Sequence, residues 1–321
     1  WNRVDGTSGL YDHDPTSGLE DFTCGEGTYN GHLGADYAIF PFPFYQMENN
    51  LAEVVAAADG VIILKEDGYF DEECAWGVGT YSNKIYLEHA DGTVTIYAHM
   101  KDGSLTDKGV GESVVVGEYL GVVGSSGQST GPHLHFEYKN ANGVSIDPYV
   151  GNCNSAITNS AWNNQIDPFQ SHLHTILNHG APAILDCPST NEFPNIQNTF
   201  APGETNYAQA YFSNVYAGDT IFYALFDATD QVLYVNTFSI WQEDFVLAKM
   251  TLPGDIPVGW PTPDTLTFWV GFAGETFERE FYIAEMTPVG IENLHELDLT
   301  LYPNPATDQL LLSGELKGNT F

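Results

Sequence analysis

Four histidines and one aspartate in the first half of the sequence could together bind a metal ion and activate water. His32 and Asp36 stand four residues apart in GHLGADY, His133 and His135 form a His-x-His pair in PHLHFEY, and His99 lies near the end of TIYAHM. Imidazole and carboxylate groups are ligands of Zn²⁺, and a catalytic zinc site has three protein ligands and one open position. Asp36 and two of the histidines would supply such a set. The other histidines would then be available for proton transfer and for stabilising an oxyanion.

Short strands and turns must hold these side chains. PHLHFEY alternates apolar and polar residues, which predicts a strand, and residues i and i+2 of a strand project from one face. His133 and His135 should therefore point the same way, with Cα atoms roughly 6.5–7 Å apart. Gly31 and Gly34 argue against a helix around His32 and favour a turn that leads into a strand. Spacing alone leaves open which histidine is a ligand and which is a base.

A second His-Leu-His, at residues 172–174, lies in QSHLHTILNHG. No unassigned H-x-x-x-D motif precedes it, and no Gly-rich strand entry surrounds it. Its apolar spacing fits a helix as well as a strand, and on a helix residues i and i+2 do not face each other. We interpret this second copy as structural.

Charge and composition restrict the possible partners. The 321 residues include 43 acidic and 9 basic ones, for a formal net charge of −34, and 43% of the residues are hydrophobic. This length and composition predict two or three domains with sizeable cores. The negative charge disfavours nucleic-acid backbones and anionic membrane surfaces, and no apolar run approaches the roughly 20 residues of a membrane-spanning helix. We expect neither a nucleic-acid partner nor membrane insertion.

The cysteines indicate an oxidising compartment. Cys24, Cys74, Cys153 and Cys187 form no C-x-x-C pair, which argues against a cysteine zinc cluster and favours two disulfides. Of the three possible pairings, Cys24–Cys74 with Cys153–Cys187 closes the most local loops and is the predicted one. The chain begins with WNRVDG, so we expect that a signal peptide, and with it a pro-segment, has already been removed.

Strand patterns and turn signals divide the chain into five regions and predict a mainly β fold. Residues 1–30 are rich in Gly, Asp and Thr and should be irregular. Residues 31–150 contain short strands, most clearly at 60–66, 84–89, 93–100 and 133–138. Residues 151–181 should be a linker or packing segment. Residues 182–287 have the alternation of an immunoglobulin-like β-sandwich, and 288–321 should be a linker followed by a C-terminal signal.

Taken together, the motifs of residues 30–150 resemble the lysostaphin-like, LytM-type zinc metalloendopeptidases. The resemblance rests on His32-x-x-x-Asp36, on VTIYAHM (94–100), and on GEYLGVVGSSGQSTGPHLHFEY (117–138), which runs into His133-x-His135. These motifs occur in the order expected for the family. The resemblance implies a twisted antiparallel β-sheet peptidase domain, with its site in a groove between loops, ahead of the C-terminal sandwich.

The same resemblance implies a role for each residue. His32, Asp36 and His135 would bind one zinc ion per chain. His133 would be the general base that deprotonates water, and His99 would stabilise the tetrahedral oxyanion together with the metal. The long acidic stretch 66–83 departs from the family pattern, and we expect it to form a groove wall that influences substrate choice.

The tail LYPNPATDQLLL (301–312) resembles the start of the C-terminal sorting domain carried by cargo of the Bacteroidetes type IX secretion system. Such a domain usually continues for more residues, so the chain is expected to be truncated here. The resemblance implies passage across the outer membrane by the type IX machinery. The protein would then be secreted or held on the cell surface.

The sequence thus predicts a secreted zinc endopeptidase whose first substrate class, by family analogy, is the peptide of bacterial peptidoglycan cross-links. An extracellular protein, such as a Gly-rich or elastic matrix, is the alternative, because anionic wall polymers would repel an acidic enzyme. An inactive homologue that binds or regulates is a third hypothesis, although every expected site position is filled. The scissile bond, the role of residues 182–287, activation by removal of a pro-segment and the oligomeric state stay open.

Overall fold

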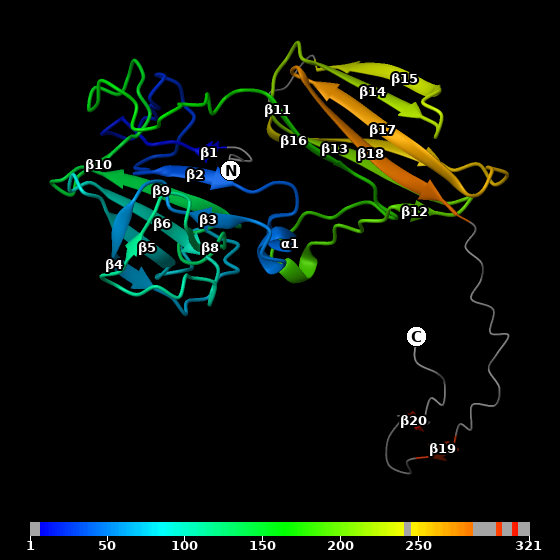
Figure 1. Cartoon of the computed structure of the whole chain (residues 1–321), viewed down its shortest axis with the longest axis horizontal. Coiled ribbons are helices and arrows are strands. Elements are labelled where there is room, and N and C mark those ends of the chain that lie inside the picture. Colours follow the sequence, from blue (N-terminus) through cyan, green and yellow to red (C-terminus); the bar gives the residue numbers. More distant parts are fainter. Residues whose placement is uncertain (1–6, 241–244, 285–299, 304–309, 314–321) are drawn as a thin grey trace. The chain divides into compact units, whose positions relative to one another are not determined.

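The computed structural model describes residues 7–240, 245–284, 300–303 and 310–313, and these confirm a mainly β chain (Figure 1). Helical structure within these ranges consists of α1 (Pro43–Glu48) and the 3₁₀ turn η1 (Ser189–Asn191). No helix in this part of the chain is long and apolar enough to cross a membrane. The chain divides into two compact units, residues 1–284 and 285–321.

An eight-stranded antiparallel sheet forms the N-terminal part of the larger unit and contains the four strands predicted most clearly. In spatial order its strands are β1 (Thr7–Gly9), β2 (Ala35–Ala38), β9 (His133–Lys139), β6 (Val94–Met100), β5 (Asn83–Glu88), β4 (Gly60–Glu66) and β7 (Ser113–Val114), with β10 (Ser145–Ile146) paired to β9. Every pair in this sheet is antiparallel. A separate antiparallel pair joins β3 (Glu53–Val55) to β8 (Tyr119–Val122).

Alternating burial explains why these segments are strands. Along β5 the side chains of Ile85 and Leu87 are fully buried, and they join Ile62, Met100 and Leu120 in one core. Burying an aliphatic side chain of this size stabilises a fold by about 1.5–3 kcal/mol. This core supports β6 and β9, the two strands that carry three of the candidate histidines.

Residues 7–30 consist mostly of turns and bends around the short strand β1. Leu10 and Phe22 are nevertheless buried, and they pack with Ala35 and Tyr149 in a core of their own. The N-terminal segment is therefore packed against β2, the strand that carries Asp36.

Two further sheets make up the rest of the larger unit. One consists of β11 (His172–Leu177), β13 (Thr205–Val215) and β16 (Phe245–Asp255); the other of β12 (Thr199–Phe200), β18 (Glu275–Ile283), β17 (Asp264–Phe272), β14 (Thr220–Phe226) and β15 (Val232–Ser239). Leu173 and Phe212 of the first sheet share a core with Ile221 and Val270 of the second. The two sheets therefore pack face to face, while an immunoglobulin-like topology stays a prediction.

Strand β11 lies within residues 151–181, which the sequence predicts as a linker or packing segment. It pairs antiparallel with β13 from His172 to Leu177. The apolar residues Leu173, Ile176 and Leu177 are spaced as well for a helix as for a strand, so the pairing with β13, and not periodicity, decides the conformation of this segment. The second His-Leu-His consequently lies on a strand of the C-terminal sheets.

In the smaller unit, β19 (Thr300–Pro303) pairs antiparallel with β20 (Leu310–Ser313). Both strands fall in or next to the stretch that resembles a type IX sorting signal. Residues 285–299, 304–309 and 314–321 of this unit lie outside the described residues. The sorting function stays a prediction.

The disulfide pairing predicted from the sequence is wrong. The bonds join Cys24 to Cys153 and Cys74 to Cys187, across sequence separations of 129 and 113 residues. Next to the first bond, the Cys153 N–H donates to the Phe22 carbonyl over 3.0 Å, which brings the N-terminal turns beside the loop after β10. Distance along the chain is a poor guide here, because antiparallel pairing brings remote segments within disulfide reach.

Candidate metal centre and active site

The register between β2 and β9 assembles the centre of the site. Asp36 lies directly opposite His135, and Ala38 lies opposite His133. Gly34 is required where the turn enters β2, because a Cβ atom there would come within 2.5 Å of the Phe136 carbonyl oxygen and 2.9 Å of the His135 ring. The H-x-x-x-D and H-x-H motifs therefore meet through backbone pairing.

Three ligand atoms converge in this centre. His135 Nδ1 lies 2.8 Å from Asp36 Oδ1, and His32 Nε2 lies 3.2 Å from both of these atoms. A tetrahedral metal with bonds of about 2.0–2.1 Å has ligand–ligand edges of roughly 3.3–3.4 Å. The triangle of two imidazole nitrogens and one carboxylate oxygen therefore fits a divalent metal ion, and His32, Asp36 and His135 form a candidate metal site.

Each of these three side chains has a second partner that orients it. His32 Nδ1–H donates to the Leu10 carbonyl over 2.7 Å, which leaves Nε2 with a lone pair. The Tyr29 hydroxyl donates to Asp36 Oδ2 over 2.8 Å, and His135 Nε2 lies 3.3 Å from Glu137 Oε1. Such outer contacts are typical of metal sites, where they fix the tautomer and the direction of each ligand.

Tyr29 and Glu137 are two site residues that are not predicted from the sequence. Tyr29 stacks on the His32 ring, with a centroid separation of 4.1 Å, and nothing in its local sequence indicates this. Glu137 continues the i, i+2 row of His133 and His135 on β9. The same alternation that pairs the histidines could therefore have identified it.

Charge in the centre is balanced between Asp36 and its histidines. Burial alone would raise the pKa of Asp36, but hydrogen bonds from His135 and His32 hold it well below its usual value. Burial would likewise lower the pKa of His135, yet hydrogen bonds to Asp36 and Glu137 raise it to about 9. A metal ion that binds His135 must therefore displace a proton, so metal affinity should increase with pH.

His133 lies beside the triangle without being part of it. Its Nε2 is 3.6 Å from Asp36 Oδ1, while its Nδ1–H donates to the Gly131 carbonyl over 2.8 Å. The carbonyl can only accept, so it fixes the proton on Nδ1 and leaves a lone pair on Nε2. His133 is thus placed and polarised as a proton acceptor next to the candidate metal site.

His99 reaches the site through an irregularity in β6. Between the pairs Asn83–Met100 and Ile85–Tyr97 the β6 strand has one residue more than its partner, and His99 has a φ of 63°. A bulge of this kind redirects a side chain, and a histidine with positive φ marks a strained position. The His99 ring centroid lies 4.8 Å from that of His133 and 5.5 Å from that of His135.

The protonation of His99 is well defined. Its Nδ1–H donates to the Ser126 carbonyl over 2.6 Å. Burial lowers the pKa of His99 to about 3, with a further contribution from the neighbouring His133 and His135. At neutral pH His99 is therefore uncharged, and its Nε2 carries a lone pair.

A groove of about 750 Å³ lies beside these groups and includes Asp36 and His133 among its lining residues. Trp76, from the long acidic stretch 66–83, also lines it, with an exposed fraction of 64% and an edge-on contact with Tyr29. This stretch forms part of the groove wall, as the sequence predicts.

The second His-Leu-His does not join this site. His172 Nδ1 lies 2.7 Å from Glu275 Oε1, and the buried His174 has an edge contact with the Phe40 ring. In the described residues, the group of side chains placed to hold a metal is that of His32, Asp36 and His135. The two copies of the tripeptide therefore differ in their surroundings.

Residues 45–148 match the family model described as Peptidase family M23. This part of the chain is therefore similar to a family of metallopeptidases. It includes His99, His133 and His135. His32 and Asp36 precede the matched residues, so their place in the site rests on the β2–β9 register.

Similar curated proteins match one domain of this chain. DD-carboxypeptidase/endopeptidase Mpg of Neisseria meningitidis is 36% identical over 121 residues, which cover 38% of this chain and 23% of that protein. Peptidoglycan DD-endopeptidase ShyC of Vibrio cholerae is 29% identical over 122 residues, again 38% of this chain and 23% of that protein. The chain thus spans about a quarter of the length of these relatives.

Solved structures with a similar domain include the catalytic domain of the M23 protein EnpA from Enterococcus faecalis. The two chains are 26% identical over a match that covers 44% of this chain and 88% of the EnpA chain, with a TM-score of 0.31. The catalytic domain of lysostaphin from Staphylococcus simulans is 25% identical, with coverage of 44% and 85% and a TM-score of 0.27.

Proposed function

We propose that this chain is a secreted zinc endopeptidase that hydrolyses peptide bonds with water. The observation that carries the proposal is the triangle of His32 Nε2, Asp36 Oδ1 and His135 Nδ1 beside a groove of peptide dimensions. This donor set suits one Zn²⁺ ion with an open coordination position. The M23 match of the surrounding domain supplies the reaction class.

When bound, the zinc ion would supply Lewis acidity to the attacking water and the substrate carbonyl. His133 would accept the proton of the water at Nε2, because its Nδ1–H is held by the Gly131 carbonyl. It would then deliver that proton to the departing amine. The fixed tautomer means that His133 needs no rearrangement before it acts.

His99 would lie near the oxygen that gains negative charge. To donate a hydrogen bond there it must carry a proton on Nε2, since Nδ1–H is already donated to Ser126. The low pKa of His99 opposes this, and developing charge on the substrate would favour it. The proposed role of His99 therefore depends on proton uptake as the reaction proceeds.

Peptide cross-links of bacterial peptidoglycan are the first substrate class that we propose. Support comes from the relatives, which are named as a peptidoglycan DD-endopeptidase and a DD-carboxypeptidase/endopeptidase. Two disulfides suit an oxidising compartment outside the cytoplasm. Export by the type IX machinery, followed by release or surface attachment, would deliver the enzyme there; this part rests on the resemblance of residues 301–312.

An extracellular protein is the second candidate substrate. The formal net charge of −34 would repel anionic wall polymers, and the lining of the groove includes no Lys or Arg from the part of the chain that the structure describes. Both features favour neutral or basic polypeptides, such as Gly-rich matrix proteins.

Cleavage-site mapping distinguishes the two substrates. The purified protein would be incubated with purified peptidoglycan and, separately, with matrix proteins, and new termini would be identified by mass spectrometry. We expect new peptide termini within the cross-links of peptidoglycan. Cleavage confined to matrix proteins would support the second candidate, and no cleavage of either would contradict the proposed peptidase activity.

A further inference from the structure

A segment from outside the M23-matched residues forms one side of the groove next to His133. Residues 185–192, here called the wall segment, lie between β11 and β12, and Leu185, Asp186, Cys187 and Glu192 line the groove. They share this lining with Asp36 and His133. The groove is therefore completed by a part of the chain that the domain match does not include.

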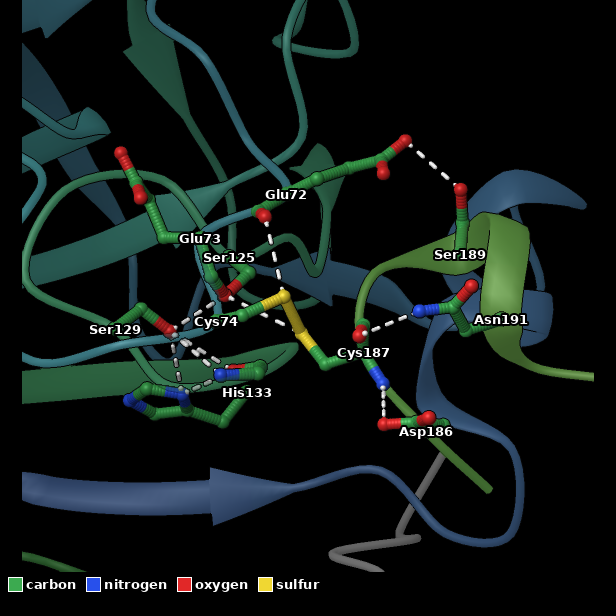
Figure 2. The surroundings of a disulfide bond; sticks show 11 residues. Glu72, Glu73, Cys74, Ser125, Ser129, His133, Asp186, Cys187, Ser189 and Asn191 are labelled. Carbon is green, nitrogen blue, oxygen red and sulfur yellow. Dashed lines mark hydrogen bonds between the residues drawn. A yellow bond between two sulfur atoms is a disulfide. The ribbon is translucent and has the colours of Figure 1, made fainter. Parts of the chain in front are cut away.

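Three contacts hold the wall segment in place. The disulfide Cys74–Cys187 joins it to the acidic stretch 66–83, close to Ser129 and His133, as Figure 2 shows. Ser189 Oγ donates to Glu72 Oε1 over 3.0 Å, and the Tyr45 N–H donates to Glu192 Oε1 over 2.7 Å. A groove wall fixed in this way is already ordered before a ligand arrives, which reduces the entropic cost of binding.

The three carboxylates that line the groove differ in their hydrogen bonds to other groups of the protein. Asp36 is surrounded by histidines, and Glu192 accepts from the backbone of α1. Asp186 is exposed, and among the described residues its side-chain hydrogen bond is a local one from the Cys187 N–H, to Oδ1 over 2.7 Å. Within this part of the chain, the Oδ2 atom of Asp186 is therefore available at the groove.

The residues around Asp186 add an apolar surface to this charge. Leu185, Phe40 and Phe44 line the same groove, and none of the described residues that line it is a lysine or arginine. A carboxylate beside apolar side chains is complementary to an ammonium group on an aliphatic stem, which buries its methylene groups and keeps its charge at the rim.

We propose that the wall segment is part of the substrate-binding site and that Asp186 favours peptides with a positively charged amine on the residue that contacts it. The Cys74–Cys187 disulfide positions this carboxylate. The inference rests on the proposed function, because it takes the groove as the one that binds the substrate.

Synthetic peptides test this preference. Each pair would be identical except for one lysine, either free or Nε-acetylated, placed in turn at positions on both sides of the cleaved bond. We expect the free amine to lower KM about two- to fivefold at one position, the size of an exposed ion pair, with kcat unchanged. Asp186→Asn should remove this difference, and Asp186→Lys should reverse it.

Asp107→Asn is the matched control. Asp107 is exposed and absent from the groove lining, so its substitution changes the net charge equally and should leave the preference intact. The double variant Cys74→Ser with Cys187→Ser should lose the preference while it keeps its metal content and a cooperative thermal unfolding transition. Retention of the preference in that variant would contradict the positioning role of the disulfide.

Calorimetric Kd values for the same peptides on the whole chain keep this test independent of turnover. Equal KM and equal Kd for free and acetylated peptides at every position would overturn the inference, whether or not the peptides are cleaved. A difference in Kd that Asp186→Asn removes, without any cleavage, would support the binding site and contradict the peptidase proposal instead.

Discussion

Asp36 and His135 face each other across the β2–β9 pair, with Asp36 Oδ1 2.8 Å from His135 Nδ1. Both side chains are held by strand register, and a slip of one residue would turn them to the other face of the sheet. His32 joins them from the turn that precedes β2. The geometry of the candidate metal site is thus fixed by the same backbone pairing that builds the sheet.

Loss of any one ligand should remove the metal. We expect His32→Ala, Asp36→Ala and His135→Ala each to abolish zinc retention and activity, because two remaining ligands bind Zn²⁺ too weakly. Metal content per chain after dialysis, measured by mass spectrometry, checks this. His89→Ala is the control, since His89 bonds to the Asp59 carbonyl and to Thr95 instead. Wild-type zinc content in any of the three variants would contradict the ligand assignment.

Substitution of His133 should give a different zinc content from substitution of the three proposed ligands. Its Nε2 lies 3.6 Å from Asp36 Oδ1, beyond the edges of the ligand triangle. We expect His133→Ala to keep zinc and to lower kcat by about 10²–10⁴, the usual contribution of a general base. If this variant lost its zinc, the assignments of His133 and His135 as base and ligand would have to be exchanged.

His99 is best tested with two substitutions compared with each other. His99→Ala should lower kcat by about 10²–10³, the loss typical of one oxyanion donor, with zinc retained. His99→Gln offers an amide N–H that can still donate, so it should recover part of that loss. Equal kcat for the two variants would argue that His99 does not act as a hydrogen-bond donor.

The sequence predicts the local elements of this site well, because they depend on local patterns. Alternation identifies β6 and β9, and the i, i+2 rule places His133 and His135 on one face. The hydroxyl of Tyr29 on Asp36 and the pairing of Cys74 with Cys187 could not be predicted. Both depend on contacts between remote segments, which periodicity does not encode.

The residue at which the C-terminal sheets begin could not be predicted from the pattern of apolar and polar residues either. The apolar residues of segment 172–177 have a spacing that fits a helix as well as a strand, and pairing with β13 makes the segment a strand. The wall segment illustrates the same limit, because its place at the groove follows from a disulfide and from the contact of Glu192 with Tyr45. Neither the disulfide nor this hydrogen bond can be predicted from the distance between the residues along the chain.

Glu192 should make stability depend on pH. Burial raises the pKa of Glu192 from 4.5 to about 7, although backbone N–H groups of Tyr45 and Phe44 act in the opposite direction. Between pH 4.5 and 7, Glu192 would keep its proton in the folded chain and lose it in the unfolded chain. The protonated carboxyl group therefore contributes to the free energy of unfolding below about pH 4.5, and this contribution is lost as pH rises through about 7.

Thermal unfolding of the wild type and of Glu192→Gln, from pH 4.5 to 8, measures this effect. Glutamine can still accept from the Tyr45 N–H but does not titrate. We expect the stability of the wild type relative to the variant to fall by on the order of 1 kcal/mol across this range. Parallel pH profiles of the two proteins would show that Glu192 does not titrate in this way.

The most direct test of a metal-dependent peptidase is hydrolysis in ¹⁸O-labelled water. The protein would be incubated with purified peptidoglycan and with matrix proteins as isolated, after removal of metal by a chelator, and after zinc is restored. We predict new carboxyl termini that carry one ¹⁸O atom, which disappear with chelation, return with zinc, and are absent for His135→Ala. Cleavage that persists after complete metal removal, or no cleavage of any substrate by the zinc-loaded protein, would contradict the account.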